Sequence, residues 1–218
     1  MSYAAYLANT RFVPYNQKVD ATRISEDTAR LVQTVSPLPE PQSAPFIVLL
    51  SGLPGSGKSY LARRLAREVP AAILESDALR KALFGKPVYT PHESGRLFQA
   101  IRRLAEDLLQ KGVPVIIDAT NITECNRRYF YGVADRLGVR LVVIHTHAPA
   151  AVVKARLVAR RLDKDEKSDA GWEVYLRMRN GAEQIKRGHF EVDTSREARR
   201  VMERIVQEIR NPDTIASL

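Results

Sequence analysis

A glycine-rich loop, Gly-Leu-Pro-Gly-Ser-Gly-Lys-Ser, lies at residues 52–59 and follows the apolar run 46–50. It is the complete G-x-x-x-x-G-K-[ST] pattern, and apolar residues at one-turn spacing behind it predict a following helix. Glycines let successive backbone N–H groups turn toward a phosphate, where the helix N-terminus adds positive potential. The pattern therefore predicts a nucleoside triphosphate site, with Lys58 near the β- and γ-phosphates and Ser59 on Mg²⁺. The nucleotide-binding residues are expected to be Gly52, Leu53, Pro54, Gly55, Ser56, Gly57, Lys58, Ser59 and Tyr60.

Length and composition fit one α/β domain with an extension. The chain has 218 residues, and no apolar stretch approaches the length of a membrane span. Residues 1–10 lack the basic start and long apolar run of a secretory signal, and a lone cysteine, Cys125, suits a reducing compartment. We therefore expect a cytoplasmic protein with no membrane partner. The net charge of +9 suggests an anionic partner such as nucleic acid, or a solvated basic surface.

Residues 1–45 differ from the rest of the chain. Residues 23–35 have the pattern of one short helix, and residues 36–45 carry four prolines, which favour an extended linker. We predict an N-terminal extension over residues 1–45, appended to a domain that spans residues 46–218.

From residue 46 onward, short apolar runs alternate with longer helical patterns, which is typical of a parallel sheet with helices on both faces. The predicted fold class is α/β, a P-loop kinase-like parallel sheet of about five strands. Strands are expected at residues 46–51, 72–75, 113–118, 140–145 and 190–192. Helices are expected at residues 58–69, 77–84, 93–110, 123–137, 149–162, 171–186 and 195–210.

Ligands of such sheets gather at the carboxyl ends of the strands. After the second predicted strand, Asp77 starts a helix and Arg80 follows one turn later on the same face. The carboxylate could accept the proton of an attacking hydroxyl while the arginine holds an anionic acceptor. A helix-capping aspartate with an exposed arginine is an equally good interpretation of the spacing alone.

After the third predicted strand, Asp118 has the position of a Walker B aspartate, which supports Mg²⁺ directly or through water. Ser59 and Asp118 are therefore the expected metal-binding residues. Thr120 and Asn121 are expected to face the cleft, although a capping role is the alternative.

A helical stretch farther along carries Arg156 and Arg160 four residues apart, and therefore on one face. These guanidinium groups could close over the triphosphate as part of a lid at about residues 156–170 and stabilise charge on the transferring group. Arg161 offers a second register for the same role.

Three other features have weaker meaning. His145 and His147 could bind metal, but no third ligand follows at suitable spacing. Trp172 is spaced to pack with Tyr175 in one helix. Residues 193–195 could form a loop beside the nucleobase or cap a helix, and the sequence does not separate these alternatives.

Taken together, these motifs resemble the predicted P-loop kinases with an AAA domain, a group that includes the kinase domain of polynucleotide 5′-kinases and is related to zeta toxins. The resemblance covers residues 46–210 and rests on the loop at 52–59, the Asp77-x-x-Arg80 element, residues 118–121 with Arg127 after them, and the arginine-bearing lid. It implies that Asp77 is the general base, that Arg80 contacts the acceptor, and that Arg156 and Arg160 hold the donor phosphates.

The expected activity is transfer of the γ-phosphoryl group of ATP, with Mg²⁺, to a hydroxyl acceptor. A polynucleotide 5′-hydroxyl is slightly favoured over a small-molecule acceptor because of the charge and the resemblance. Two rival hypotheses remain: an ATP-binding module that hydrolyses ATP slowly, and a nucleic-acid-binding protein whose basic surface matters more than its chemistry.

Overall fold

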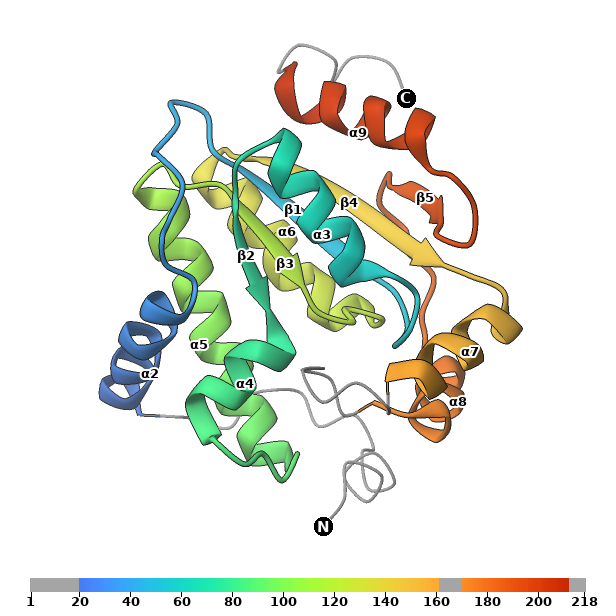
Figure 1. Ribbon diagram of the computed structural model, residues 1–218. Coiled ribbons are helices and arrows are strands. Elements are labelled where there is room, and N and C mark those ends of the chain that lie inside the picture. Colours follow the sequence, from blue (N-terminus) through green and yellow to red (C-terminus); the bar gives the residue numbers. More distant parts are fainter. Residues whose placement is uncertain (1–19, 161–169, 212–218) are drawn as a thin grey trace.

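A computed structural model describes residues 20–160 and 170–211 as an α/β fold around a five-stranded parallel sheet (Figure 1). The strand order is β2-β3-β1-β4-β5, so the glycine-rich loop leaves the central strand. All four strand pairings are parallel, which confirms the predicted fold class. The strands are β1 (Phe46–Ser51), β2 (Ala72–Glu75), β3 (Val115–Asp118), β4 (Arg140–His147) and β5 (Phe190–Asp193).

The central strand is buried on both faces, and its side chains alternate between two hydrophobic cores. Ile47 and Leu49 pack into the core beneath α2, α5 and α6, whereas Val48 and Leu50 pack into the core beneath α3 and α9. This alternation follows from the pleat of a strand, which directs successive side chains to opposite faces. A continuous apolar run is therefore what a central parallel strand requires.

Helices cover both faces and the carboxyl end of the sheet (Figure 1). In chain order they are α2 (Ala21–Thr34), α3 (Lys58–Glu68), α4 (Ser76–Phe84), α5 (Pro91–Gln110), α6 (Glu124–Leu137), α7 (Ala150–Arg160), α8 (Trp172–Asn180) and α9 (Arg199–Arg210). Within residues 20–160 and 170–211, no helix combines the length and apolarity needed to traverse a bilayer.

Two predicted helices are shorter in the structure. The helix expected at residues 171–186 ends at Asn180, because residues 182–185 instead lie along the start of α6, where Glu183 N donates to Ile122 O. The helix expected from residue 195 begins at Arg199, because residues 194–198 form a loop. In both segments, hydrogen bonds to distant residues outweigh local helix propensity.

Helix α2 packs on the domain, although the sequence suggests an appendage. Leu31 is fully buried in the core beneath α5, and Arg30 donates to Ala82 O in α4. Asp27 accepts two hydrogen bonds from Arg96 of α5. The division of the chain at residues 45/46 stays a prediction, but α2 braces the two helices that follow β2.

Replacing Asp27 with alanine should destabilise the fold by about 2 kcal/mol, because the partly buried Arg96 guanidinium would lose the carboxylate that accepts both of its hydrogen bonds. Asp27 is 1% exposed, so the pair is not a solvent-screened surface contact. Urea denaturation followed by circular dichroism measures the change. Ser25→Ala, on the exposed side of the same helix, is the control. A loss below about 0.5 kcal/mol would show that α2 is not braced by this pair.

Candidate functional site

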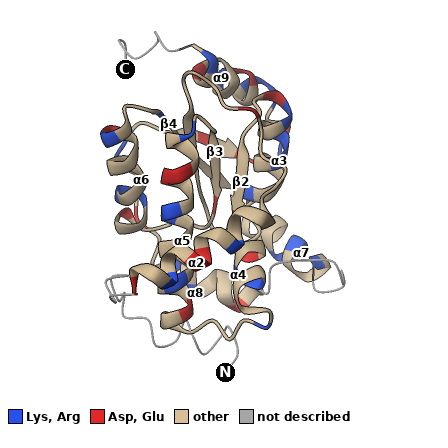
Figure 2. Ribbon diagram, turned by 90° about the vertical axis from the view of Figure 1, so that its left-hand side faces the viewer, with Lys and Arg blue, Asp and Glu red and all other residues tan. Residues whose placement is uncertain are grey.

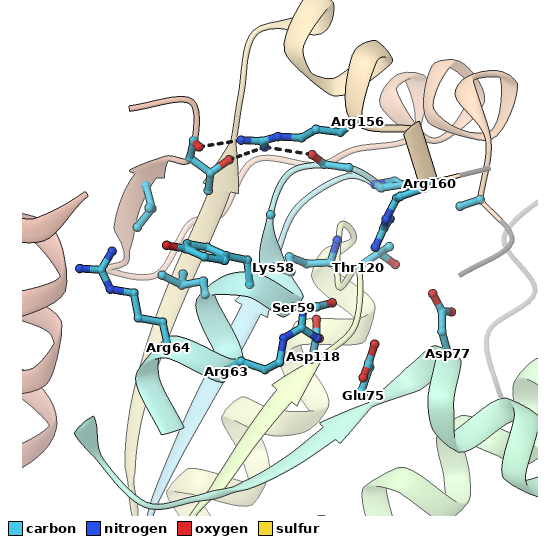
Figure 3. Close-up of a pocket in the computed structure, with 18 of the residues that line it drawn as sticks. Lys58, Ser59, Arg63, Arg64, Glu75, Asp77, Asp118, Thr120, Arg156 and Arg160 are labelled. Atoms are coloured by element: carbon cyan, nitrogen blue, oxygen red, sulfur yellow. Dashed lines mark hydrogen bonds between the residues drawn. The ribbon is translucent and has the colours of Figure 1, made fainter. Parts of the chain in front are cut away.

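A cavity of about 640 Å³ opens at the carboxyl ends of β1, β2 and β3 (Figure 3). It is lined by the glycine-rich loop, the first turns of α3 and α4, the end of α7 and the loop between β5 and α9. This is where ligands bind in open parallel sheets. The cavity therefore brings together residues that are more than a hundred positions apart in the chain.

The glycine-rich loop has the conformation that its sequence predicts. Gly52 has φ +155° and Gly57 has φ +92°, and α3 begins at Lys58 directly after the loop. A Cβ atom at Gly52 would lie 2.5 Å from Thr146 O, and one at Gly57 would lie 2.9 Å from Thr194 Oγ1. Side chains are excluded at both positions by backbone strain and by the close approach of Thr146 in β4 and of Thr194 in the loop after β5.

Lys58 is buried at the base of the cavity, and its Nζ donates to Gly52 O and Leu53 O, both at 3.0 Å. Burial lowers the pKa of Lys58. The negative charges of Asp118 and Asp77 oppose that shift, and the positive charge of Arg160 adds to it. The ammonium group is thus held within the loop by two carbonyls, where it can interact with a phosphate without reorganising the fold.

Asp118 ends β3 and lies beside Ser59, which donates a hydrogen bond to its carboxylate. Burial raises the pKa of Asp118, while Lys58 and the Ser59 hydrogen bond lower it less strongly. Asp118 Oδ2 is buried and has no hydrogen-bond partner within the described chain. A hydroxyl and a carboxylate oxygen are ligands that suit Mg²⁺, so this pair fits the predicted metal-binding role.

Asp77 lies in the first turn of α4 and lines the cavity together with Glu75. In Figure 3 both carboxylates lie below Arg160, at the end of β2 and the start of α4. The Asp77 carboxylate acts electrostatically on both Lys58 and Asp118. Asp77 is therefore placed to act on a group beside the phosphate site.

The two lid arginines have different surroundings. Arg160 lines the cavity, and its positive charge helps to lower the pKa of Lys58. Arg156 also lines it, but its guanidinium donates to Gly55 O and to Thr194 (Figure 3). Arg161 and the predicted lid residues 161–169 lie outside the described residues.

Arg80 is not among the residues that line the cavity with Asp77. Its side chain is 7% exposed, donates to Ser94 Oγ at 3.1 Å and lies over the Tyr89 ring. Glu93 Oε2 lies 3.9 Å away. Arg80 therefore joins α4 to α5, and its role toward an acceptor stays a prediction.

Asn121 and Arg127 do not line the cavity. For Asn121 this differs from the predicted position, which faces the cleft. Thr120 lines the cavity, but Asn121 is buried and donates to Leu50 O. Arg127 is fully buried and donates to carbonyl groups of Asn121, Glu183 and Gln184. Both side chains hold backbone segments together, because each is surrounded by carbonyl groups that need donors.

The loop between β5 and α9 contributes cavity residues that the sequence does not single out. Arg196, Glu197 and Ala198 line the cavity beside Tyr60. Ser195 instead turns back to Asp193, which accepts from both its backbone N–H and its hydroxyl. This favours the loop interpretation of residues 193–195 over a helix cap at that point. The one sequence signal for these cavity residues is that they follow the carboxyl end of a predicted strand, where ligands of such sheets bind.

The histidines at the end of β4 belong to a separate cluster around Glu191. His145 and His189 each lie 2.8 Å from a Glu191 oxygen, and their hydrogen bonds together outweigh burial and lower the pKa of that carboxyl. Among residues 20–160 and 170–211, no group of histidine, cysteine or acidic side chains has the arrangement of a metal site. Trp172 stacks on Tyr175 with ring centroids 4.8 Å apart, as the helix spacing predicts.

The affinity for ADP should fall as the pH rises through the lowered pKa of Lys58. A phosphate stabilises the protonated amine, so binding takes up a proton above the pKa of the free protein and weakens with increasing pH. Calorimetric titration with ADP between about pH 7 and about pH 10 measures this. Lys58→Arg should flatten the profile, because arginine keeps its charge in this range. A profile identical in both proteins would contradict this assignment.

The sequence has relatives among kinases of small molecules. It is 33% identical over 119 residues to an adenylyl-sulfate kinase of Myxococcus xanthus, covering 53% of this chain and 64% of that protein. It is 36% identical over 91 residues to a shikimate kinase of Corynebacterium glutamicum, covering 39% of this chain and 53% of that protein. The chain thus spans less than two thirds of the length of these relatives.

The fold is shared with known structures. The Mycobacterium tuberculosis APS kinase, solved with AMPPNP and APS, superposes with a TM-score of 0.57 at 18% identity, covering 79% of this chain and all of that chain (100%). Residues 47–185, more than half of the sequence, match a family described as an AAA domain (AAA_33). The chain belongs to this AAA domain family.

Proposed function

We propose that the protein is an ATP-dependent phosphotransferase that moves the γ-phosphoryl group to a hydroxyl of a small molecule. The observation that carries the proposal is the placement of Asp77 across one cavity from Lys58, Ser59 and Asp118. A nucleotide-binding loop alone would serve many activities. A carboxylate facing the phosphate end of that loop supplies what transfer to a hydroxyl additionally needs.

In the proposed reaction, the backbone N–H groups of the loop and Lys58 bind the phosphates of ATP. Asp77 accepts the proton of the acceptor hydroxyl as its oxygen attacks the γ-phosphorus, and the bond to the bridging oxygen of ADP breaks. Arg160 stabilises negative charge that spreads over the transferring group. Ser59 and Asp118 would hold Mg²⁺, which supplies further charge neutralisation at the phosphates.

Two observations favour a small-molecule acceptor. The curated relatives reported above are named for adenylyl sulfate and shikimate, which are small molecules. The basic residues in Figure 2 are spread over several helices, among them α3, α7 and α9, with acidic residues between them on α9. The comparisons therefore support a small-molecule acceptor better than the polynucleotide acceptor that the sequence slightly favours.

A polynucleotide 5′-hydroxyl is the second candidate acceptor because the net charge of +9 exceeds what one nucleotide site needs. An acceptor screen with γ-labelled ATP separates the two. Panels of hydroxyl-bearing metabolites and of 5′-hydroxyl oligonucleotides are incubated with the enzyme, and the labelled products are separated. Label on a small molecule supports the proposal, whereas label only on oligonucleotides would replace the acceptor class. Release of inorganic phosphate without transfer to either panel would favour the slow ATP-hydrolysing module.

A further inference from the structure

Thr194 connects three parts of the nucleotide cavity. Its hydroxyl donates to Ser56 O in the glycine-rich loop at 2.8 Å and lies farther, at 3.3 Å, from His147 O. The same hydroxyl oxygen accepts from Arg156 Nη1 at 2.8 Å, and Thr194 O accepts from Arg156 Nη2 at 2.7 Å (Figure 3). A residue of the β5–α9 loop thus connects helix α7 to the glycine-rich loop.

These contacts determine how the peptide groups of the loop are oriented. In a trans peptide, the C=O and N–H bonds point to opposite sides. The peptide between Gly55 and Ser56 obeys this: its oxygen accepts from Arg156 at 3.2 Å, and its N–H donates to Leu53 O at 3.1 Å. Leu53 O is also bonded by Lys58 Nζ, so this N–H lies on the inner side of the loop.

The next peptide, between Ser56 and Gly57, follows the same rule. Because Thr194 holds Ser56 O, the Gly57 N–H of the same peptide points away from Thr194, within the cavity that Gly57, Lys58 and Thr194 all line. Glycine is required there, since a Cβ would lie 2.9 Å from the Thr194 hydroxyl oxygen. If this peptide turned over, a carbonyl oxygen would face the phosphate instead of a donor.

We infer that Thr194 and Arg156 form a clasp that holds the Gly57 N–H toward the phosphate, and that both are positioning residues for nucleotide binding. The inference rests on the proposed function and extends it. In this arrangement the Arg156 guanidinium is directed at Gly55 O and at Thr194, so it acts through the loop. The clasp preorganises a donor that would otherwise have to be ordered when the phosphate binds.

The test uses Thr194→Val, which keeps the shape and removes the hydroxyl, and Thr194→Ser, which restores it. Binding of Mg²⁺–ADP and of inorganic tripolyphosphate is measured by calorimetry on the full chain. Thr194→Val should weaken both ligands about tenfold, and Thr194→Ser should bind within about twofold of the parent protein. The matched control is Ser195→Ala in the same loop, whose hydroxyl bonds only to Asp193 in the described chain. It should bind both ligands as the parent protein does.

Arg156→Gln distinguishes positioning from direct phosphate contact. Alone, it should weaken tripolyphosphate binding by about the same factor as Thr194→Val, and adding it to Thr194→Val should cost little more. If the losses of affinity in the two single variants multiply in the double variant, the two residues act independently. That result would overturn the clasp and assign Arg156 to direct contact with the phosphates. If Thr194→Val lowers the thermal midpoint enough to unfold the protein, the equality between Thr194→Ser and the parent, together with the Arg156→Gln loss, carries the same prediction.

The outcomes separate this inference from the proposed function. A parent protein that binds neither ligand removes the nucleotide site and with it the clasp. A parent protein that binds both ligands, with Thr194→Val unchanged, overturns the clasp alone and leaves the nucleotide site in place.

Discussion

Replacing Lys58 with methionine is expected to reduce kcat/KM for phosphoryl transfer by about 10³-fold. Methionine fills similar space, so the change removes mainly the charge. That charge lies at the base of the cavity, held by Gly52 O and Leu53 O, close enough to Asp118 and Asp77 for their fields to act on it. The measurement is the initial rate of labelled phosphate transfer to the acceptor identified by the screen.

The control for Lys58→Met is Lys111→Met, an exposed lysine at the end of α5. It should leave the rate unchanged, which separates the local field at the phosphates from the general effect of removing one positive charge. Circular dichroism shows whether the buried substitution is folded. A folded Lys58→Met protein that loses less than about tenfold would contradict the assigned role of the amine.

Asp77→Asn is expected to lower kcat by about 10² to about 10⁴ while the Kd for Mg²⁺–ADP changes by less than about twofold. The amide has the shape of the carboxylate but cannot accept a proton from the hydroxyl. Nucleotide affinity should persist, because the phosphates are held by the loop and by Lys58. Rapid-mix measurement of a single turnover, with nucleotide saturating, reports the chemical step separately from binding.

Glu75→Gln is the matched control, because Glu75 lines the same cavity from the end of β2. Its effect should stay below about tenfold, because in the proposed reaction Asp77, not Glu75, accepts the proton of the acceptor hydroxyl. If the two variants exchange their effects, Glu75 is the base. If Asp77→Asn turns over ATP as the parent protein does, the hydrolysing module becomes the better description.

The sequence determines the elements that depend on neighbouring residues. The run 46–50 must be buried on both faces because it has no polar side, and the glycines that follow it allow the loop to take positive φ. Asp118 lies at the carboxyl edge of the sheet because it is the last residue of the apolar strand β3. These features are local in the chain, so pattern and spacing were sufficient to predict them.

The tertiary structure alone decided which polar side chains face the cavity and which hold the fold together. Arg80 is a predicted acceptor-binding residue, whose role stays a prediction, and Asn121 and Arg127 follow Asp118 in the sequence. Each is nevertheless buried among oxygen atoms that require hydrogen-bond donors: Ser94, the carbonyls of residues 183 and 184, and Leu50 O. Thr194 shows the reverse case, since nothing beside it in the chain marks its contact with Ser56. Because a hydrogen bond depends on where a distant backbone group lies, residue type and spacing could not assign these roles.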